Sequence, residues 1–271
     1  MVVRIKLLKS WKYFIKVLFN TFNVMEEIMS GSKVKIMAQG AMIASLFGVL
    51  GVINIYTGKS EMILPRPISL CEIDKKDGIL RLLYQVIGKG TKHLCTLQKG
   101  STIKILGALG NGFFINEQHR NHILIGGGIG TPPMLELAKK LQGNIHIFIG
   151  AKSKPILIEE FQKIGASISI ATDDGSYGIR GTILDAIEIE DPIADMIYAC
   201  GPKVMLKYAS EWAEEKQIKI QVSMEERMAC GIGACVGCAI KIRKKGTSDW
   251  ENLKVCKDGP VFWGDEVVWN D

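Results

Sequence analysis

The stretch NHILIGGGIGTPPMLELAKKLQ, residues 121–142, decides the fold of the chain around it. It opens with an apolar run, passes through a glycine-rich turn and continues as a helical segment. Thr131 is suited to be the N-cap of that helix, and Pro132 to lie in its first turn. The order strand, turn, helix predicts the repeating unit of an α/β domain.

The same alternation continues along the chain. Further strands are predicted at 144–153, 166–176, 195–202 and 218–225, and helices at 155–165, 181–189 and 203–217. Strands that alternate with helices imply right-handed crossovers and a parallel sheet covered on both faces. Residues 118–223 are therefore predicted to form a doubly wound parallel α/β domain that binds a nucleotide.

Residues 32–117 show short strands and turns instead. The segments GILRLLYQVIG (78–88) and GSTIKILGALGNGF (100–113) read as strands, and KGTKHL (89–94) between them reads as a turn that starts a helix. Short strands at this spacing predict a small antiparallel β-barrel or a β-sandwich. The predicted fold class is thus α+β with several domains, preceded by an atypical, basic and aromatic N-terminal extension at 1–31.

Composition excludes several classes of protein. The chain has 271 residues and a net charge of +6, with no basic stripe interleaved with aromatic residues, so nucleic-acid binding is not expected. Residues 36–56 carry no charge and are long enough to span a bilayer, but their Gln, Asn and glycines favour buried strands of a soluble domain. No secretory signal is recognisable, and we expect a cytoplasmic protein without a membrane span.

Four of the seven cysteines lie in the last 42 residues. Cys230, Cys235 and Cys238 have the spacing C-x4-C-x2-C, and Cys256 follows after 17 intervening residues. This is the plant-type spacing of a [2Fe–2S] cluster, for which glycines allow the loop to wrap around two irons. A structural zinc site is the alternative, although zinc usually takes paired C-x2-C units. Cys71, Cys95 and Cys200 lie in apolar contexts and are expected to be buried small hydrophobes.

Further motifs carry a resemblance to a known family. The segments RPIS (66–69), GT (90–91), GGGIGTPP (126–133) and CGP (200–202) occur in the order found in the ferredoxin reductase superfamily. Together with the C-terminal cysteine block, the chain from about residue 50 to 271 resembles the electron transfer subunit of NAD-dependent dihydroorotate dehydrogenase. The resemblance implies an FAD-binding barrel at 32–117, a nicotinamide-nucleotide domain at 118–223 and a [2Fe–2S] lobe at 224–271.

The resemblance also implies site residues. Arg66 would bind the flavin diphosphate, and Ser69 would lie near the flavin N5. The implied FAD residues are Arg66, Pro67, Ile68, Ser69, Leu83, Tyr84, Gln85, Gly90 and Thr91. The implied NAD residues are Gly127, Gly128, Gly130, Thr131, Cys200, Gly201 and Pro202. GGGIGTPP is not the usual G-x-G-x-x-G fingerprint, and a purely structural tight turn is the alternative. Acidic residues at 173–174 favour NAD over NADP.

The function implied is electron transfer in pyrimidine biosynthesis. Electrons would pass from the FMN of a catalytic subunit through [2Fe–2S] and FAD to NAD⁺, within a heterotetramer of two copies of each subunit. Two alternatives remain open. One is a related subunit of an NADH-dependent ferredoxin:NADP oxidoreductase or a sulfhydrogenase, and the other is a non-catalytic iron–sulfur redox sensor or zinc-stabilised module.

The chain departs from this family before residue 66. The P-G-Q-F turn that normally precedes the R-P-x-S strand is absent, and GVLGVINIYTG follows Phe47 directly. Either the barrel is incomplete, or residues 1–31 replace part of it.

Overall fold

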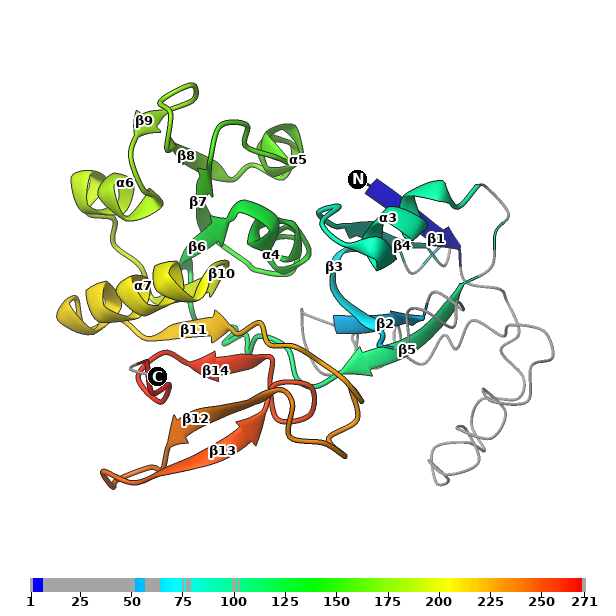
Figure 1. Ribbon diagram of the computed structural model, residues 1–271. Coiled ribbons are helices and arrows are strands. Elements are labelled where there is room, and N and C mark those ends of the chain that lie inside the picture. The colour runs from blue at the N-terminus through cyan, green and yellow to red at the C-terminus, as the bar shows by residue number, and fades with distance from the viewer. Residues whose placement is uncertain are drawn as a thin grey trace.

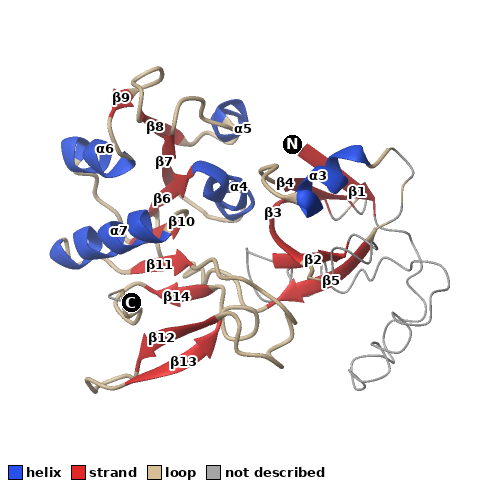
Figure 2. Ribbon diagram, viewed as in Figure 1, coloured by secondary structure: helices blue, strands red, loops and turns tan. Residues whose placement is uncertain are grey.

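A computed structural model describes residues 2–6, 52–56, 64–74, 76, 79–98, 101 and 103–269. It contains two sheets and a C-terminal hairpin (Figure 1, Figure 2). Most of the predicted N-terminal extension and the uncharged segment up to residue 51 lie outside the described residues. Among the helices that are described, none combines the length and the apolar character needed to cross a lipid bilayer.

The first sheet has five antiparallel strands in the order β1-β4-β3-β2-β5. Their bounds are β1 Val2–Lys6, β2 Val52–Tyr56, β3 Arg66–Asp74, β4 Ile79–Leu83 and β5 Lys104–Leu109, with helix α3 (Lys89–Thr96) between β4 and β5. Successive side chains of β2 point to opposite faces of the sheet, so they enter two different cores. Ile53 and Ile55 enter the core of this sheet, whereas Val52 joins the core shared with the second sheet and the C-terminal residues.

The first described residues of the chain belong to this sheet. Strand β1 pairs with β4 along its whole length, from Val2 opposite Leu83 to Lys6 opposite Ile79. Residues 2–6 thus supply an edge strand of this sheet. This favours the possibility that residues 1–31 replace part of the barrel over the possibility that the barrel is incomplete.

The second sheet has seven strands in the order β14-β11-β10-β6-β7-β8-β9. The strands are β6 Asn121–Gly127, β7 Asn144–Ala151, β8 Ser167–Thr172, β9 Ile179–Arg180, β10 Met196–Cys200, β11 Ile220–Ser223 and β14 Val261–Trp263. All neighbours are parallel except β14, which runs antiparallel to β11. The predicted strands and helices from residue 121 onward are present, and β9 and β14 were not predicted.

Helices cover both faces of this sheet (Figure 1). They are α4 Thr131–Ala138, α5 Ile158–Lys163, α6 Ile183–Glu190 and α7 Lys203–Glu215, preceded at α4 by the 3-10 turn η2 Gly128–Gly130. Side chains of α4 and α5 fill one core and those of α6 and α7 the other, so the doubly wound prediction is confirmed. The predicted N-cap of α4 was wrong by one residue, because η2 makes Gly130 the cap and Thr131 the first helical residue.

The C-terminal residues 224–269, here called the cysteine lobe, are joined to the second sheet. An irregular cysteine loop (224–238) leads into a hairpin of β12 (Ala239–Arg243) and β13 (Trp250–Lys254), after which β14 returns to pair with β11. Cys238 and Cys256 lie in the same core as Val222 and Phe262 of the sheet. The lobe is therefore packed as part of the α/β unit and is anchored at both of its ends.

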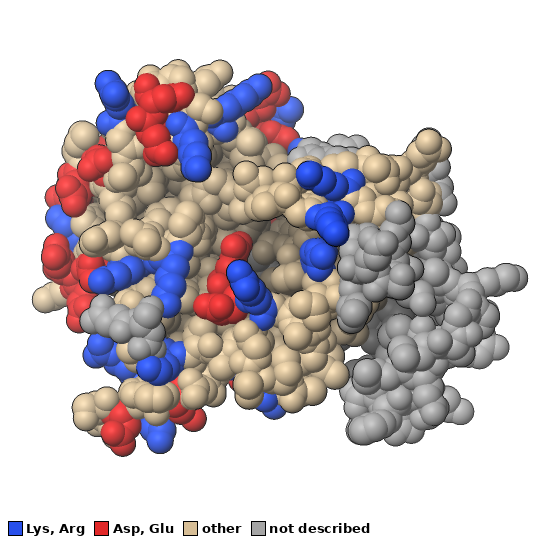
Figure 3. All heavy atoms as spheres, viewed as in Figure 1, with Lys and Arg blue, Asp and Glu red and all other residues tan. Residues whose placement is uncertain are grey.

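Acidic and basic side chains are interspersed on the face of the protein seen in Figure 3.

Candidate functional site

The cysteine loop is wrapped as its glycines predict. Gly231 and Gly233 have φ of 71° and 79°, values that other residues rarely adopt. The backbone N–H of Cys235 donates to the Cys230 sulfur at 3.4 Å, and the Lys254 ammonium donates to the Gly233 carbonyl at 2.5 Å. The loop thus turns its backbone donors toward a cysteine sulfur.

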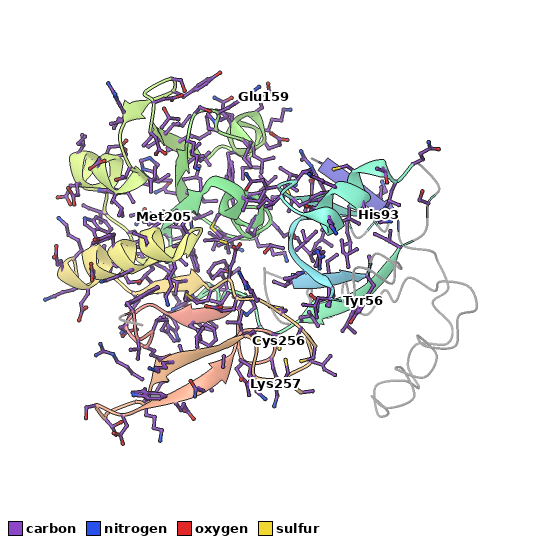
Figure 4. The ribbon with its side chains drawn as sticks, in the orientation of Figure 1. Tyr56, His93, Glu159, Met205, Cys256 and Lys257 are labelled. Carbon is purple, nitrogen blue, oxygen red and sulfur yellow. The ribbon has the colours of Figure 1, made fainter. Side chains whose placement is uncertain are left out.

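The four cysteines come together in two pairs. Burial would raise the pKa of Cys230, but N–H groups of Cys235 and neighbouring loop residues, with the Cys235 side chain, lower it to about 6. Burial and a hydrogen bond with Cys238 raise the pKa of Cys256 to about 12. Cys235 thus hydrogen-bonds with Cys230, and Cys238 hydrogen-bonds with Cys256. Figure 4 labels Cys256 on the lobe and Tyr56 on β2.

Two thiol pairs fit a two-iron centre, in which each iron takes two cysteines. Within the described part of the chain, no group of three or more His, Cys, Asp or Glu side chains that could hold a metal ion is found. The loop N–H groups near Cys230 are the donors that stabilise a thiolate cluster and tune its potential. The residues present therefore fit the [2Fe–2S] assignment made from the spacing.

On the five-stranded sheet, the R-P-x-S segment meets the start of α3. Arg66 leads β3 and donates from Nη1 to the Leu64 carbonyl at 2.6 Å. Its guanidinium lies against Gly90, where an added Cβ would be 2.3 Å from the Arg66 Nε. A guanidinium beside a glycine-rich helix N-terminus can take a diphosphate, because both supply N–H donors to it. The Thr91 hydroxyl accepts from the backbone N–H groups of Ile87 and Gly88, which orders this turn.

The other implied flavin residues lie on the same sheet. Ser69 is half-buried on β3 opposite Val52 of β2. Tyr84 is buried, with its hydroxyl 3.8 Å from the Cys95 sulfur, so its side chain is part of the core. Leu83 and Gln85 on either side of it are more exposed. A flavin at 83–85 would therefore contact the backbone and these two flanking side chains.

The implied nicotinamide residues meet at the carboxyl ends of β6 and β10. These strands are adjacent, while the chain runs from β6 to β7 on the other side, so this is the switch point of the sheet. An added Cβ on Gly130 would lie 2.2 Å from the Cys200 carbonyl oxygen, and one on Gly127 would lie 2.8 Å from Pro202 Cδ. The absence of side chains at both glycines lets the two turns approach each other closely.

Cys200 at this edge is a neutral thiol. Burial, together with a smaller contribution from the charge of Glu225, raises its pKa to about 12 against the opposing hydrogen bond with Ser223. Sequence reasoning did not single out Glu225, which follows β11 at the beginning of the cysteine loop. The thiol can donate a hydrogen bond but does not serve as a thiolate at neutral pH.

The comparisons with known proteins agree with this arrangement. Residues 225–268 match the iron-sulfur cluster binding domain of dihydroorotate dehydrogenase B. The dihydroorotate dehydrogenase B (NAD(+)) electron transfer subunit of Caldanaerobacter subterraneus subsp. tengcongensis is 41% identical over 212 residues, covering 78% of this chain and 83% of that protein. The chain belongs to this family of electron transfer subunits. The subunit of the same name from Streptococcus mutans is 38% identical over 222 residues, covering 80% and 85% of the two chains.

Solved structures extend the comparison. A chain of the NADH-dependent reduced ferredoxin–NADP oxidoreductase superposes with a TM-score of 0.74 at 28% identity, covering 85% of this chain and 83% of that one. The cytochrome P450 reductase of Amycolatopsis shares the fold, with a TM-score of 0.52 at 18% identity over 64% and 58% of the two chains. The predicted family, fold and oxidoreductase subunit role are confirmed, and the predicted FAD and iron–sulfur cofactors agree with these matches.

Asn111 is a residue beside the cysteine lobe that sequence reasoning missed. Its Nδ2 donates to the Asp258 carbonyl at 3.0 Å, and its Oδ1 accepts from the Val261 N–H at 3.1 Å. Its backbone N–H also donates to the Gly259 carbonyl. The linker between the two sheets, residues 110–120, thus holds the segment that directly follows Cys256. The only sequence signal was the glycine-rich context GNG at 110–112.

A second missed feature sets the five-stranded sheet against the α/β unit. The carboxylate of Glu136 on α4 is buried and accepts the Ile73 N–H of β3 at 3.0 Å. Arg81 of β4 forms ion pairs with Glu160 of α5 at 2.8 Å and with Glu72 of β3 at 3.5 Å. The contacts of Glu136 with Ile73 and of Arg81 with Glu160 are partly buried and hold the five-stranded sheet against the helices of the seven-stranded sheet.

Proposed function

We propose that this chain relays electrons between the FMN of a dihydroorotate-oxidising catalytic subunit and NAD⁺, through a [2Fe–2S] cluster and FAD. One observation carries the proposal: the cysteine loop packs directly on strand β2, whose neighbour β3 holds the R-P-x-S segment. An added Cβ on Gly231 would lie 2.0 Å from Asn54 Nδ2, and Asn54 pairs with Pro67. The two redox sites are therefore separated by one strand.

Each of the three redox groups is assigned to a separate set of residues. Arg66 and the start of α3 hold the flavin diphosphate, and the backbone of 83–85 supports the ring. Cys230, Cys235, Cys238 and Cys256 hold the cluster. When bound, FAD exchanges a hydride with the nicotinamide and single electrons with the cluster. The neutral thiol of Cys200 and the glycines at 127, 128, 130 and 201 admit the nicotinamide nucleotide at the switch point.

Apolar side chains on the cysteine loop support docking of a partner. Ile232 and Val236 are 47% and 75% exposed, next to the cysteines at 230 and 235. Exposed apolar groups beside a redox centre suit an interface from which water is excluded. We assign this surface to the FMN-containing catalytic subunit, in a heterotetramer of two copies of each chain in the cytoplasm.

The division of labour gives the test. Among the residues assigned to the sites, no side chain is arranged as a base for dihydroorotate, and we assign that chemistry to the partner. The purified chain should oxidise NADH with an artificial acceptor, and should oxidise dihydroorotate only after the catalytic subunit is added. Cys230→Ser should abolish transfer in the complex, whereas Cys95→Ser is the control. Dihydroorotate oxidation by the single chain at the rate of the complex would refute the assignment.

The TM-score of 0.74 to a chain of a ferredoxin–NADP oxidoreductase makes a ferredoxin-linked role the second candidate. Mass spectrometry of the subunit that co-purifies with the natively expressed chain separates the two. A dihydroorotate-oxidising partner supports the first role, and a ferredoxin-reducing partner supports the second.

A further inference from the structure

Asn54 is a buried amide that has no hydrogen-bond partner in the described part of the chain. It lies at the centre of β2, fully inaccessible to solvent, and neither its Nδ2 nor its Oδ1 has a partner among the described residues. Leaving buried polar groups unpaired costs about 1–3 kcal/mol for each group. Asn is also unfavourable in strands. Such a residue in a central strand calls for a partner that the described part of the polypeptide does not provide.

The amide is directed at the cysteine loop. Its Nδ2 lies so close to Gly231 that an added Cβ there would be only 2.0 Å away. Gly231 directly follows Cys230, and the Leu109 side chain lies on the same side of the glycine, 3.4 Å from that Cβ position. The Leu109 side chain is apolar and offers the amide no hydrogen bond. Apolar packing therefore does not account for an amide side chain at this position beside the cysteine loop.

The amide also lies between the two proposed redox sites. In the β2–β3 register, Asn54 is opposite Pro67, and Val52 is opposite Ser69. Val52 belongs to the core that contains Cys238 and Cys256. Val52 and Asn54 lie on the same face of β2, and this face is next to both the R-P-x-S segment and the cysteine loop. Asn54 is the buried polar residue on that face.

We propose that Asn54 is a positioning residue that donates a hydrogen bond from Nδ2 to a sulfur at the Cys230 end of the cluster. The carboxamide N–H is a donor, and thiolate sulfur is an acceptor that a buried donor can stabilise. A donor stabilises the more negative, reduced cluster and so raises its reduction potential. The proposal rests on the proposed function, because it requires the cluster.

The test is an EPR-monitored redox titration of the holoprotein. Asn54→Leu removes the donor at similar volume, and Asn54→Asp keeps the shape but offers a carboxylate that cannot donate. Ile55→Val, on the opposite face of the same strand, is the matched control for disturbance of β2. Each variant is also assayed for iron and sulfide content.

We expect the equilibrium constant for one-electron reduction of the cluster to fall about tenfold in Asn54→Leu, which lowers the midpoint potential by about 59 mV. In Asn54→Asp the midpoint potential should fall at least as far. Ile55→Val should keep the wild-type midpoint. Full cluster content with an unchanged midpoint in both Asn54 variants would overturn the proposal. Loss of the cluster from both would overturn it as well, because Asn54 would then be a packing residue of the loop. A wild-type protein without a [2Fe–2S] signal would instead refute the proposed function.

Discussion

The backbone of Gly130 lies against the carbonyl of Cys200, with no room for a side chain: a Cβ on Gly130 would be 2.2 Å from that oxygen. Gly130→Ala must separate the two turns at the switch point, at a cost of about 1–3 kcal/mol. We expect a raised KM for NADH, measured with an artificial acceptor, together with a lower melting temperature.

Gly165→Ala is the control for that variant. Gly165 has φ of 78° and nothing within 4 Å of its Cβ position, so the substitution strains the backbone without closing a site. It should lower the melting temperature and leave the KM for NADH unchanged. An equal KM in Gly130→Ala and wild type would show that the glycine run is only a structural turn.

Asn111 is expected to protect the cluster through the segment after Cys256. Asn111→Ala removes the two side-chain hydrogen bonds to Asp258 and Val261, worth about 1–2 kcal/mol together. The Cys256 segment should open more often, so iron should pass to a chelator roughly tenfold faster. Asn116→Ala on the same linker, whose amide contacts His119 instead, is the control. Equal rates of iron release would remove Asn111 from the site.

Stability should fall on mild acidification because of one buried and one half-buried histidine. Burial lowers the pKa of His122, against the opposing hydrogen bond that its Nε2–H donates to the Gln142 carbonyl. Burial likewise lowers the pKa of His146, opposed by Glu190. The unfolded chain then binds protons more readily, so the stabilisation is complete above about pH 6.5 and is lost as pH falls through the folded pKa.

The His122 contribution can be isolated. NMR titration of its ring protons should give a pKa below that of a free histidine, and His122→Gln should reduce the loss of unfolding free energy between pH 7.5 and 5.5. A ring pKa at or above the free value would contradict the burial argument.

The parts predicted from the sequence were those with local signals. The run from Asn121 through the glycine turn specifies its strand and helix within a few residues, and the cysteine spacing indicates the iron–sulfur domain at 225–268, while the four cysteine ligands remain a prediction. These signals need no knowledge of distant residues. The roles assigned to individual flavin and nicotinamide residues came from resemblance and remain predictions.

The parts that were not predicted depend on contacts between distant segments. Strand β14 is three residues long and becomes a strand only because β11 offers it an edge. Asn111 is unremarkable in its own segment and gains its importance from Asp258, 147 residues away. Asn54 looks unfavourable in a strand until the cysteine loop is packed on it. Such pairings are set by tertiary packing, which no local pattern encodes.

Arg66 provides the most direct test of the flavin assignment. Its guanidinium is held between the Leu64 carbonyl and the backbone of Gly90, so its N–H fork is oriented before any ligand arrives. Arg66→Lys keeps the charge but loses the planar fork, so FAD affinity should fall roughly tenfold. Flavin fluorescence on dilution measures the dissociation constant, with Arg243→Lys on the hairpin as the control. An unchanged FAD affinity in Arg66→Lys would mean that the diphosphate is held elsewhere, and the R-P-x-S segment would lose its assigned role.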